Sequence, residues 1–139
     1  MKITLAQINF VVGDIEGNKE KIIAAAQQSK GSSLLIFSEL SLCGFPPYNL
    51  LNYSDFIERC EKAIDEIAER CDTIPLLIGA PVRNTSGKGK PLFNAAIFLH
   101  QGKRQVFKKK NVGLSNYFEP ADETNILQLG CMKVAVTIG

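Results

Sequence analysis

The stretch that decides the fold reads FSELSLCGFPPYNLL and spans residues 37–51. It begins at the end of the apolar run 34–37, which is typical of a strand covered on both faces. A carboxylate, Glu39, follows directly, and a charge at the end of such a strand needs a partner or a function. Gly44 and the Pro46-Pro47 pair then exclude helix and predict a rigid turn. Because ligands bind at the carboxyl ends of strands in open α/β sheets, Glu39 is the first candidate site residue.

Strands and helices alternate around this stretch. Apolar periodicity and turn residues predict a βαβ pattern in the first half, a hairpin through Gln101-Gly102, and Asn18 as the N-cap of the first helix. The fold class is therefore α/β. The expected elements are a strand at 2–10, a helix at 18–30, a strand at 33–38, a helix at 54–71, strands at 76–80, 93–99 and 103–108, and two short strands within 126–138.

Composition limits the classes of function. The chain has 139 residues, 45% of them hydrophobic and 22% charged, which suits one core, and no linker divides it. A net charge of +2 is too small to indicate a nucleic-acid partner. No run approaches the about 20 apolar residues that span a bilayer, and the chain opens directly into a strand, so no membrane contact and a cytoplasmic location are expected.

Cysteine spacing gives no sign of a metal centre. The four cysteines show no C-x-x-C spacing and no nearby histidine, so no metal ligands are expected. Cys60 and Cys71 fall on the apolar stripe of the second helix and are expected to be buried and reduced. Cys43 has no basic neighbour in the sequence, which makes it a poor candidate nucleophile, and Cys131 is no better placed.

Six parts of the chain are similar to segments of one known family: 3–9, 12–15 with Asn18, Glu39 with 44–51, 75–81, 93–96 and 106–109. Together they resemble the nitrilase (carbon-nitrogen hydrolase) superfamily, in the glutaminase branch found in glutamine-dependent NAD synthetases. The resemblance covers nearly the whole chain, and it implies that residues 1–139 are the N-terminal portion of a glutaminase domain. The implied fold is part of a four-layer α-β-β-α sandwich, about its first half.

The resemblance also implies a Cys-Glu-Lys mechanism for hydrolysis of an amide. Glu39 matches the general base and Lys109 the cation that stabilises the tetrahedral intermediate, with Lys108 and Lys110 as close competitors. Strand alternation allows only one side of this lysine triplet to face the site. The family's cysteine nucleophile follows its last matched strand at once, where this chain has Gly139, and Ser115 stands where the family has proline. The nucleophile is therefore expected to be absent and the isolated chain inactive.

The implied partners follow from the same resemblance. They are glutamine as substrate, a C-terminal synthetase domain that uses ATP and magnesium, and further copies of the chain in a homo-oligomer, while the amidase step itself needs no cofactor. Two alternatives stay open at this point. One is a stand-alone amidase of the superfamily, and the other is a non-catalytic fragment or remnant that keeps the fold for assembly.

Overall fold

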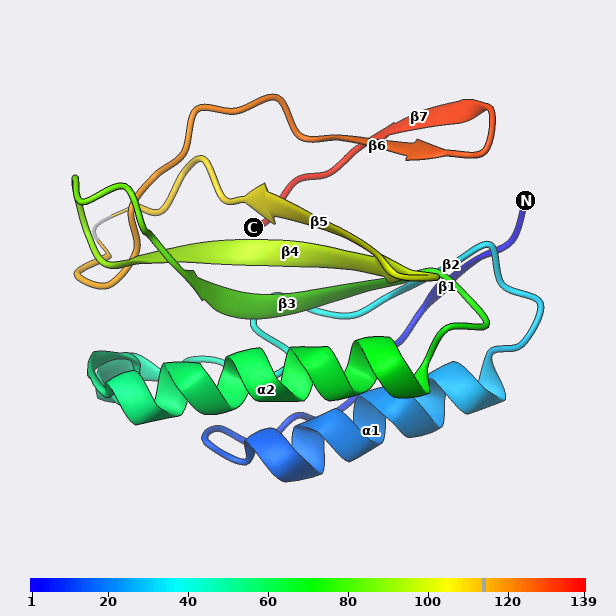
Figure 1. Ribbon diagram of the computed structural model, residues 1–139, viewed down its shortest axis with the longest axis horizontal. Helices are drawn as coiled ribbons and strands as arrows, with labels where there is room; N and C mark the ends of the chain where they lie inside the picture. The colour runs from blue at the N-terminus through cyan, green and yellow to red at the C-terminus, as the bar shows by residue number, and fades with distance from the viewer. Residues whose placement is uncertain (114) are drawn as a thin grey trace.

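The computed structural model describes residues 1–113 and 115–139. A five-stranded sheet has two helices on one face and a two-stranded hairpin on the other (Figure 1). The elements in chain order are β1 (Ile3–Leu5), α1 (Ile15–Gln28), β2 (Leu34–Ile36), the 3-10 helix η1 (Tyr48–Asn52), α2 (Ser54–Arg70), β3 (Leu76–Arg83), β4 (Leu92–His100), β5 (Lys103–Lys108), β6 (Ile126–Leu129) and β7 (Met132–Ala135).

The sheet combines a parallel half with an antiparallel half. Its strand order is β1-β2-β3-β4-β5. Strands β1, β2 and β3 run parallel to one another, and β4 runs antiparallel to both β3 and β5. Helices α1 and α2 connect the parallel strands, as the βαβ pattern predicts, and the turn at Gln101-Gly102 joins β4 to β5. The predicted α/β class and the predicted hairpin are confirmed. The carboxyl ends of β2, β3 and β5 consequently share one edge of the sheet.

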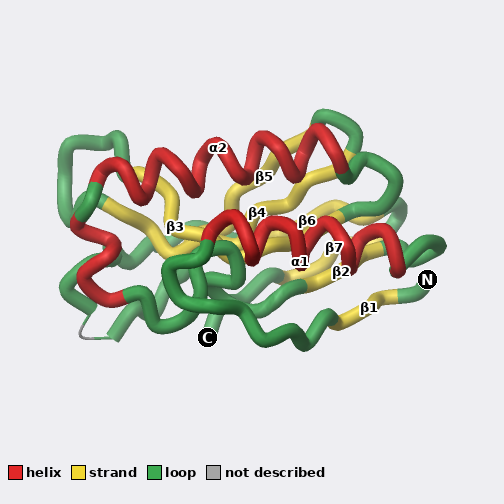
Figure 2. Tube along the Cα trace, turned by 90° about the horizontal axis from the view of Figure 1, so that it is seen from below, coloured by secondary structure: helices red, strands yellow, loops and turns green. Residues whose placement is uncertain are grey.

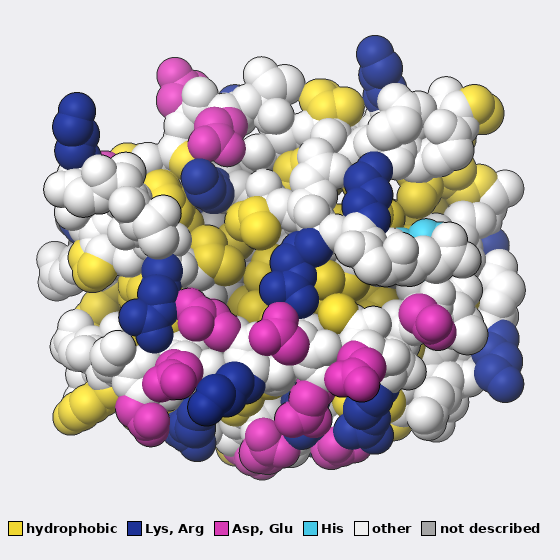
Figure 3. All heavy atoms as spheres, in the orientation of Figure 1, with side chains coloured by type: hydrophobic (Ala, Val, Ile, Leu, Met, Phe, Trp, Pro, Cys, Tyr) yellow, Lys and Arg dark blue, Asp and Glu magenta, His cyan; other side chains and the backbone are white. Residues whose placement is uncertain are grey.

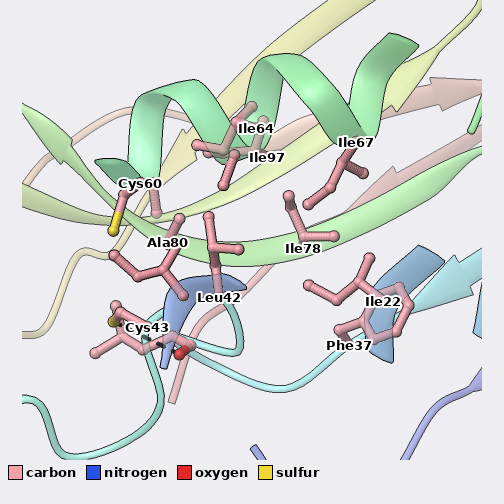
Figure 4. Packing of buried hydrophobic residues seen from close by; sticks show 14 of the residues in the cluster. Ile22, Phe37, Leu42, Cys43, Cys60, Ile64, Ile67, Ile78, Ala80 and Ile97 are labelled. Carbon is pink, nitrogen blue, oxygen red and sulfur yellow. Dashed lines mark hydrogen bonds between the residues drawn. The ribbon is translucent and has the colours of Figure 1, made fainter. Parts of the chain in front are cut away.

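The helical layer covers one face of the sheet with apolar side chains. Helices α1 and α2 lie side by side on the same side of the strands (Figure 2). Ile64 and Ile67 of α2 point toward Ile78 and Ala80 of β3, and all four are buried (Figure 4). This face contains most of the core, so the stability of the domain depends mainly on contacts between the helices and the sheet.

The opposite face packs against the β6–β7 hairpin. Leu77, Phe98 and Phe107 of the sheet form a second buried cluster with Leu127 and Leu129 of the hairpin. In the space-filling view, charged side chains of both signs gather over the helical layer, while apolar side chains show between that layer and the hairpin (Figure 3). No helix in the described residues is both long and apolar enough to cross a membrane.

The first helix begins earlier than predicted. It starts at Ile15, and the side chain of Asp14 caps it by accepting a hydrogen bond from Gly17 N at 2.9 Å. Asn18 is instead fully buried, accepting from Val11 N at 2.9 Å and donating to Val11 O at 2.8 Å and Leu42 O at 3.1 Å. The predicted cap at Asn18 is wrong because its amide satisfies the peptide groups of two loops that the sequence pattern does not connect.

The first strand is also shorter than predicted. It ends at Leu5 rather than near residue 10. Ala6 N still donates to Ile36 O, and the chain then leaves the sheet and reaches Asn18 through Val11. The remaining predicted elements match the structure to within a few residues.

Replacement of Asn18 by alanine should destabilise the fold. The loss leaves the buried carbonyl of Leu42 and the partly buried peptide groups of Val11 without the Asn18 amide, so the free energy of unfolding should fall by roughly 1–3 kcal/mol. Urea unfolding followed by circular dichroism measures the change. Gln27→Ala, on the exposed face of the same helix, is the control and should stay within about 0.5 kcal/mol of wild type. Equal midpoints for the two variants would contradict this role of Asn18.

Candidate active site

The segment after β2 is held against β3 by hydrogen bonds on both sides of Glu39. Phe37 N donates to Leu77 O at 2.9 Å before it, and Leu42 N donates to Gly79 O at 3.0 Å after it. The buried Ser41 hydroxyl accepts from Gly79 N at 3.1 Å. Between these hydrogen bonds, residues 38–40 protrude from the sheet as a short turn. Glu39 therefore lies on a turn with fixed ends.

Gly79 lets this turn approach the sheet. A Cβ atom at this position would lie 2.6 Å from Ser38 O and would also collide with Leu40 N. Such short contacts are not found between real side chains and backbone, so a larger residue would push the turn away from β3. The glycine thus sets the height of Glu39 above the sheet.

Glu39 forms a partly buried ion pair with Lys109. Lys109 Nζ donates to Glu39 Oε1 at 2.7 Å, and the two side chains are only 18% and 25% exposed. Asn94 Nδ2 donates to the same oxygen at 2.7 Å. Glu39 follows β2, Asn94 belongs to β4 and Lys109 directly follows β5, so three parts of the sheet converge on one carboxylate.

The neighbouring lysines point away from this carboxylate. Lys108 Nζ pairs with Glu123 Oε1 at 3.2 Å and lies 4.4 Å from the centre of the Phe93 ring. Lys110 is exposed. Of the three lysines, Lys109 is the one that the structure brings to Glu39.

Gly139 lies against the ammonium group of Lys109. A Cβ atom built on it would lie 2.8 Å from Lys109 Nζ, and Gly139 and Glu39 line a common cavity of about 110 Å³. Its φ of +97° is one that residues with side chains rarely adopt. A side chain at position 139 would therefore require a small movement of the lysine tip and of the backbone. The structure places Glu39, Lys109 and position 139 next to one another.

A larger cleft opens beside the ion pair. Its volume is about 490 Å³. One wall is the segment 115–118, which Phe118 and Glu119 fix to Leu92 of β4 through a bridge and a 2.8 Å hydrogen bond. Apart from Glu39 and Lys109, the lining is uncharged and largely apolar or aromatic: Leu40, Phe45, Pro46, Pro47, Tyr48, Leu51, Asn94, Val112, Ser115, Asn116, Tyr117 and Phe118.

The buried cysteines are unsuited to nucleophilic chemistry. Cys43 is fully buried and lies in the helix-side core (Figure 4), and this burial raises the pKa of its thiol. Burial also raises the pKa of Cys60 to about 12 and raises the pKa of Cys71. Cys131 is exposed and lies in the turn between β6 and β7, away from Glu39. Within the described residues, no three His, Cys, Asp or Glu side chains are grouped to hold a metal ion.

Local sequence patterns indicate no role for Asn94, although it lies in segment 93–96 of the family resemblance. The signal is that Asn94 is an uncharged polar residue inside the otherwise apolar run 92–99. A buried amide in such a run must have a partner, but its sequence position does not say which one.

Comparison with known proteins identifies the family. A family model described as carbon-nitrogen hydrolase matches residues 2–137. This chain belongs to the carbon-nitrogen hydrolases. Glutamine-dependent NAD(+) synthetases from Aquifex aeolicus and Synechocystis are both 35% identical to it, and the matches cover 99% and 98% of this chain. They cover only 25% and 27% of those relatives, so the chain spans about a quarter of their length.

Solved structures give the same assignment. A glutamine-dependent NAD+ synthetase from Acinetobacter baumannii superposes with a TM-score of 0.88 at 27% identity, over 97% of this chain and 27% of that one. An amidase from Nesterenkonia sp. superposes with a TM-score of 0.81 over 99% of this chain and 54% of that one. Its identity is 20%, so it is evidence of the fold alone. The predicted superfamily and its fold are confirmed.

Thiol labelling tests the placement of the cysteines. Of the four thiols, Cys131 is exposed, while Cys43, Cys60 and Cys71 are buried with raised pKa values. An aromatic disulfide reagent at mildly alkaline pH should therefore react rapidly with one thiol per folded chain and with all four after unfolding. Cys131→Ser should remove the rapid phase and Cys43→Ser should leave it unchanged. Rapid labelling of Cys43 in the folded chain would contradict its buried position.

Proposed function

We propose that the chain is the N-terminal portion of a glutamine-hydrolysing domain that supplies ammonia for NAD synthesis. The observation that supports this most directly is the partly buried Glu39–Lys109 pair beside position 139, at the edge of an otherwise uncharged cleft. The relatives that match nearly the whole chain are named glutamine-dependent NAD(+) synthetases. The partner in this proposal is a C-terminal synthetase domain that uses ATP and magnesium.

In the proposed reaction, Glu39 transfers the proton and Lys109 stabilises the negative charge that develops on oxygen. The Glu39 carboxylate takes the proton of a cysteine thiol, and the sulfur attacks the side-chain amide carbon of glutamine. The Lys109 ammonium stabilises the negative oxygen of the tetrahedral intermediate. The carbon–nitrogen bond breaks as Glu39 returns the proton to the departing ammonia, and water then hydrolyses the thioester with Glu39 again as base.

The sulfur of this reaction belongs at position 139, where the chain has glycine. Without it, no thioester forms at this site, and Cys43 is buried in the helix-side core with a raised pKa. We therefore expect the sequence with Gly139 to release no ammonia from glutamine. The uncharged cleft would hold the amide away from bulk water, which strengthens both charge interactions at the reacting carbon.

A stand-alone amidase is the second candidate. The superposition on an amidase over 99% of this chain is the observation behind it, and that likeness concerns the fold alone. The two candidates differ in where the ammonia goes. A glutaminase domain delivers it to NAD formation, whereas a stand-alone amidase does not.

The use of glutamine or ammonia as nitrogen source for NAD formation tests the proposed function. The full product of the gene that encodes this chain should form NAD from deamido-NAD, ATP and ammonia, and should not use glutamine. Gly139→Cys should introduce glutamine-dependent NAD formation, since it places a thiol beside Lys109. Gly139→Ser is the matched control and should stay inactive with glutamine. Use of glutamine by the protein with Gly139 would show that the assigned nucleophile position is wrong.

The roles of the charged pair can be tested in the Gly139→Cys background. Glu39→Gln and Lys109→Met should each reduce glutamine-dependent activity by a factor on the order of 10² or more, because each group acts in the transition state. Ammonia-dependent synthesis should be largely unaffected, since ammonia enters after this step. Lys108→Met is the control, because Lys108 pairs with Glu123 instead of Glu39. If Lys108→Met lost activity and Lys109→Met kept it, the assigned lysine would be wrong.

A further inference from the structure

Asn94 is a buried amide that contacts both members of the charged pair. It is 3% exposed and stands near the start of β4, on the same face of the strand as Ala96 and Phe98. Its Nδ2 donates to Glu39 Oε1 at 2.7 Å, and its backbone oxygen accepts a 2.8 Å hydrogen bond from Lys109 N. One residue thus holds the base through its side chain and the cation through its backbone.

The orientation of this amide is set by Glu39. An ionised carboxylate oxygen can only accept hydrogen bonds, so the NH₂ group must face it. The amide oxygen Oδ1 is then turned away, and it is a buried side-chain atom with no partner in the described part of the chain. A buried acceptor without a partner lowers stability. The benefit of an amide at this position therefore lies in the hydrogen bond to Glu39 and not in the stability of β4.

The two oxygens of Glu39 are consequently different. Oε1 accepts from both Lys109 Nζ and Asn94 Nδ2, each at 2.7 Å. Oε2 receives no hydrogen bond from any described residue, so its lone pairs stay free to take a proton. Since one carboxylate oxygen is fixed by two donors, rotation of the group is restrained and the free oxygen keeps one direction.

We propose that Asn94 is a positioning residue that fixes the Glu39 carboxylate and assigns Oε2 as its proton-carrying oxygen. This inference rests on the proposed function. In that reaction, the proton moves from the thiol sulfur to Oε2 as the sulfur–carbon bond forms, and from Oε2 to the amide nitrogen as the carbon–nitrogen bond breaks. Asn94 acts through Glu39 and through the backbone of Lys109, and it takes no part in either transfer.

Kinetics separate this role from a structural one. The test uses the full gene product carrying Gly139→Cys. There, Asn94→Leu should lower kcat with glutamine by about 10- to 100-fold, because the Glu39 carboxylate loses its fixed orientation. KM and ammonia-dependent synthesis should be unchanged. The urea midpoint should stay the same or rise, since the partnerless Oδ1 is removed. Asn125→Leu is the matched control: that amide donates to Lys108 O, on β5, and does not contact Glu39. A kcat unchanged by Asn94→Leu would overturn the proposal.

A second measurement is independent of turnover. In the full gene product with Gly139 in place, the side-chain carboxyl ¹³C signal of Glu39 should shift or broaden in Asn94→Leu and stay in place in Asn125→Leu. An unchanged Glu39 signal in Asn94→Leu would exclude positioning by Asn94. If the Gly139→Cys protein does not use glutamine, the proposed function fails, while the carboxyl signal still decides whether Asn94 holds Glu39.

Discussion

The absence of a side chain at Gly79 is the constraint on which the site depends. β3 lies between β2, after which Glu39 follows, and β4, which contains Asn94. Because nothing larger than hydrogen stands on Gly79, the backbone of 38–40 can lie close to the sheet and carry the carboxylate across β3. The hydrogen bonds of Ser41 and Leu42 to Gly79 then lock that approach. At this height, the Glu39 carboxylate lies 2.7 Å from Lys109 Nζ.

The helix-side face of the sheet contains most of the core, and the site residues Asn94 and Lys109 lie on the opposite face. Strand alternation puts Asn94 on the face of Ala96 and Phe98, and Lys109 on the face of Phe107, which is the face opposite the helices. The interlocked contacts of α1 and α2 are on the other side. Polar groups at the site therefore do not interrupt the main core, and a charged pair with an unpartnered amide oxygen can be tolerated there.

Much of this arrangement can be predicted from local sequence patterns. Apolar periodicity locates both helices, and turn residues locate the β4–β5 and β6–β7 hairpins. Alternation predicts that Lys109 points opposite to its neighbours, but the choice of this lysine came from the family resemblance. The patterns fail where a contact is distant in sequence. The amide of Asn18 meets Leu42, 24 residues away, and that of Asn94 meets Glu39, 55 residues away. Neither partner can be deduced from spacing.

The resting ion pair and the proposed reaction compete for the same ammonium. With glycine at position 139, the Lys109 ammonium lies 2.8 Å from the point where a Cβ atom would stand, and it is bonded to Glu39 Oε1. A thiol there must displace the tip of Lys109, and the developing oxyanion then needs that same cation. Asn94 donates to Oε1 independently of Lys109, so the carboxylate keeps one fixed partner while the lysine moves. A second, uncharged donor therefore lets the cation change its partner without releasing the base.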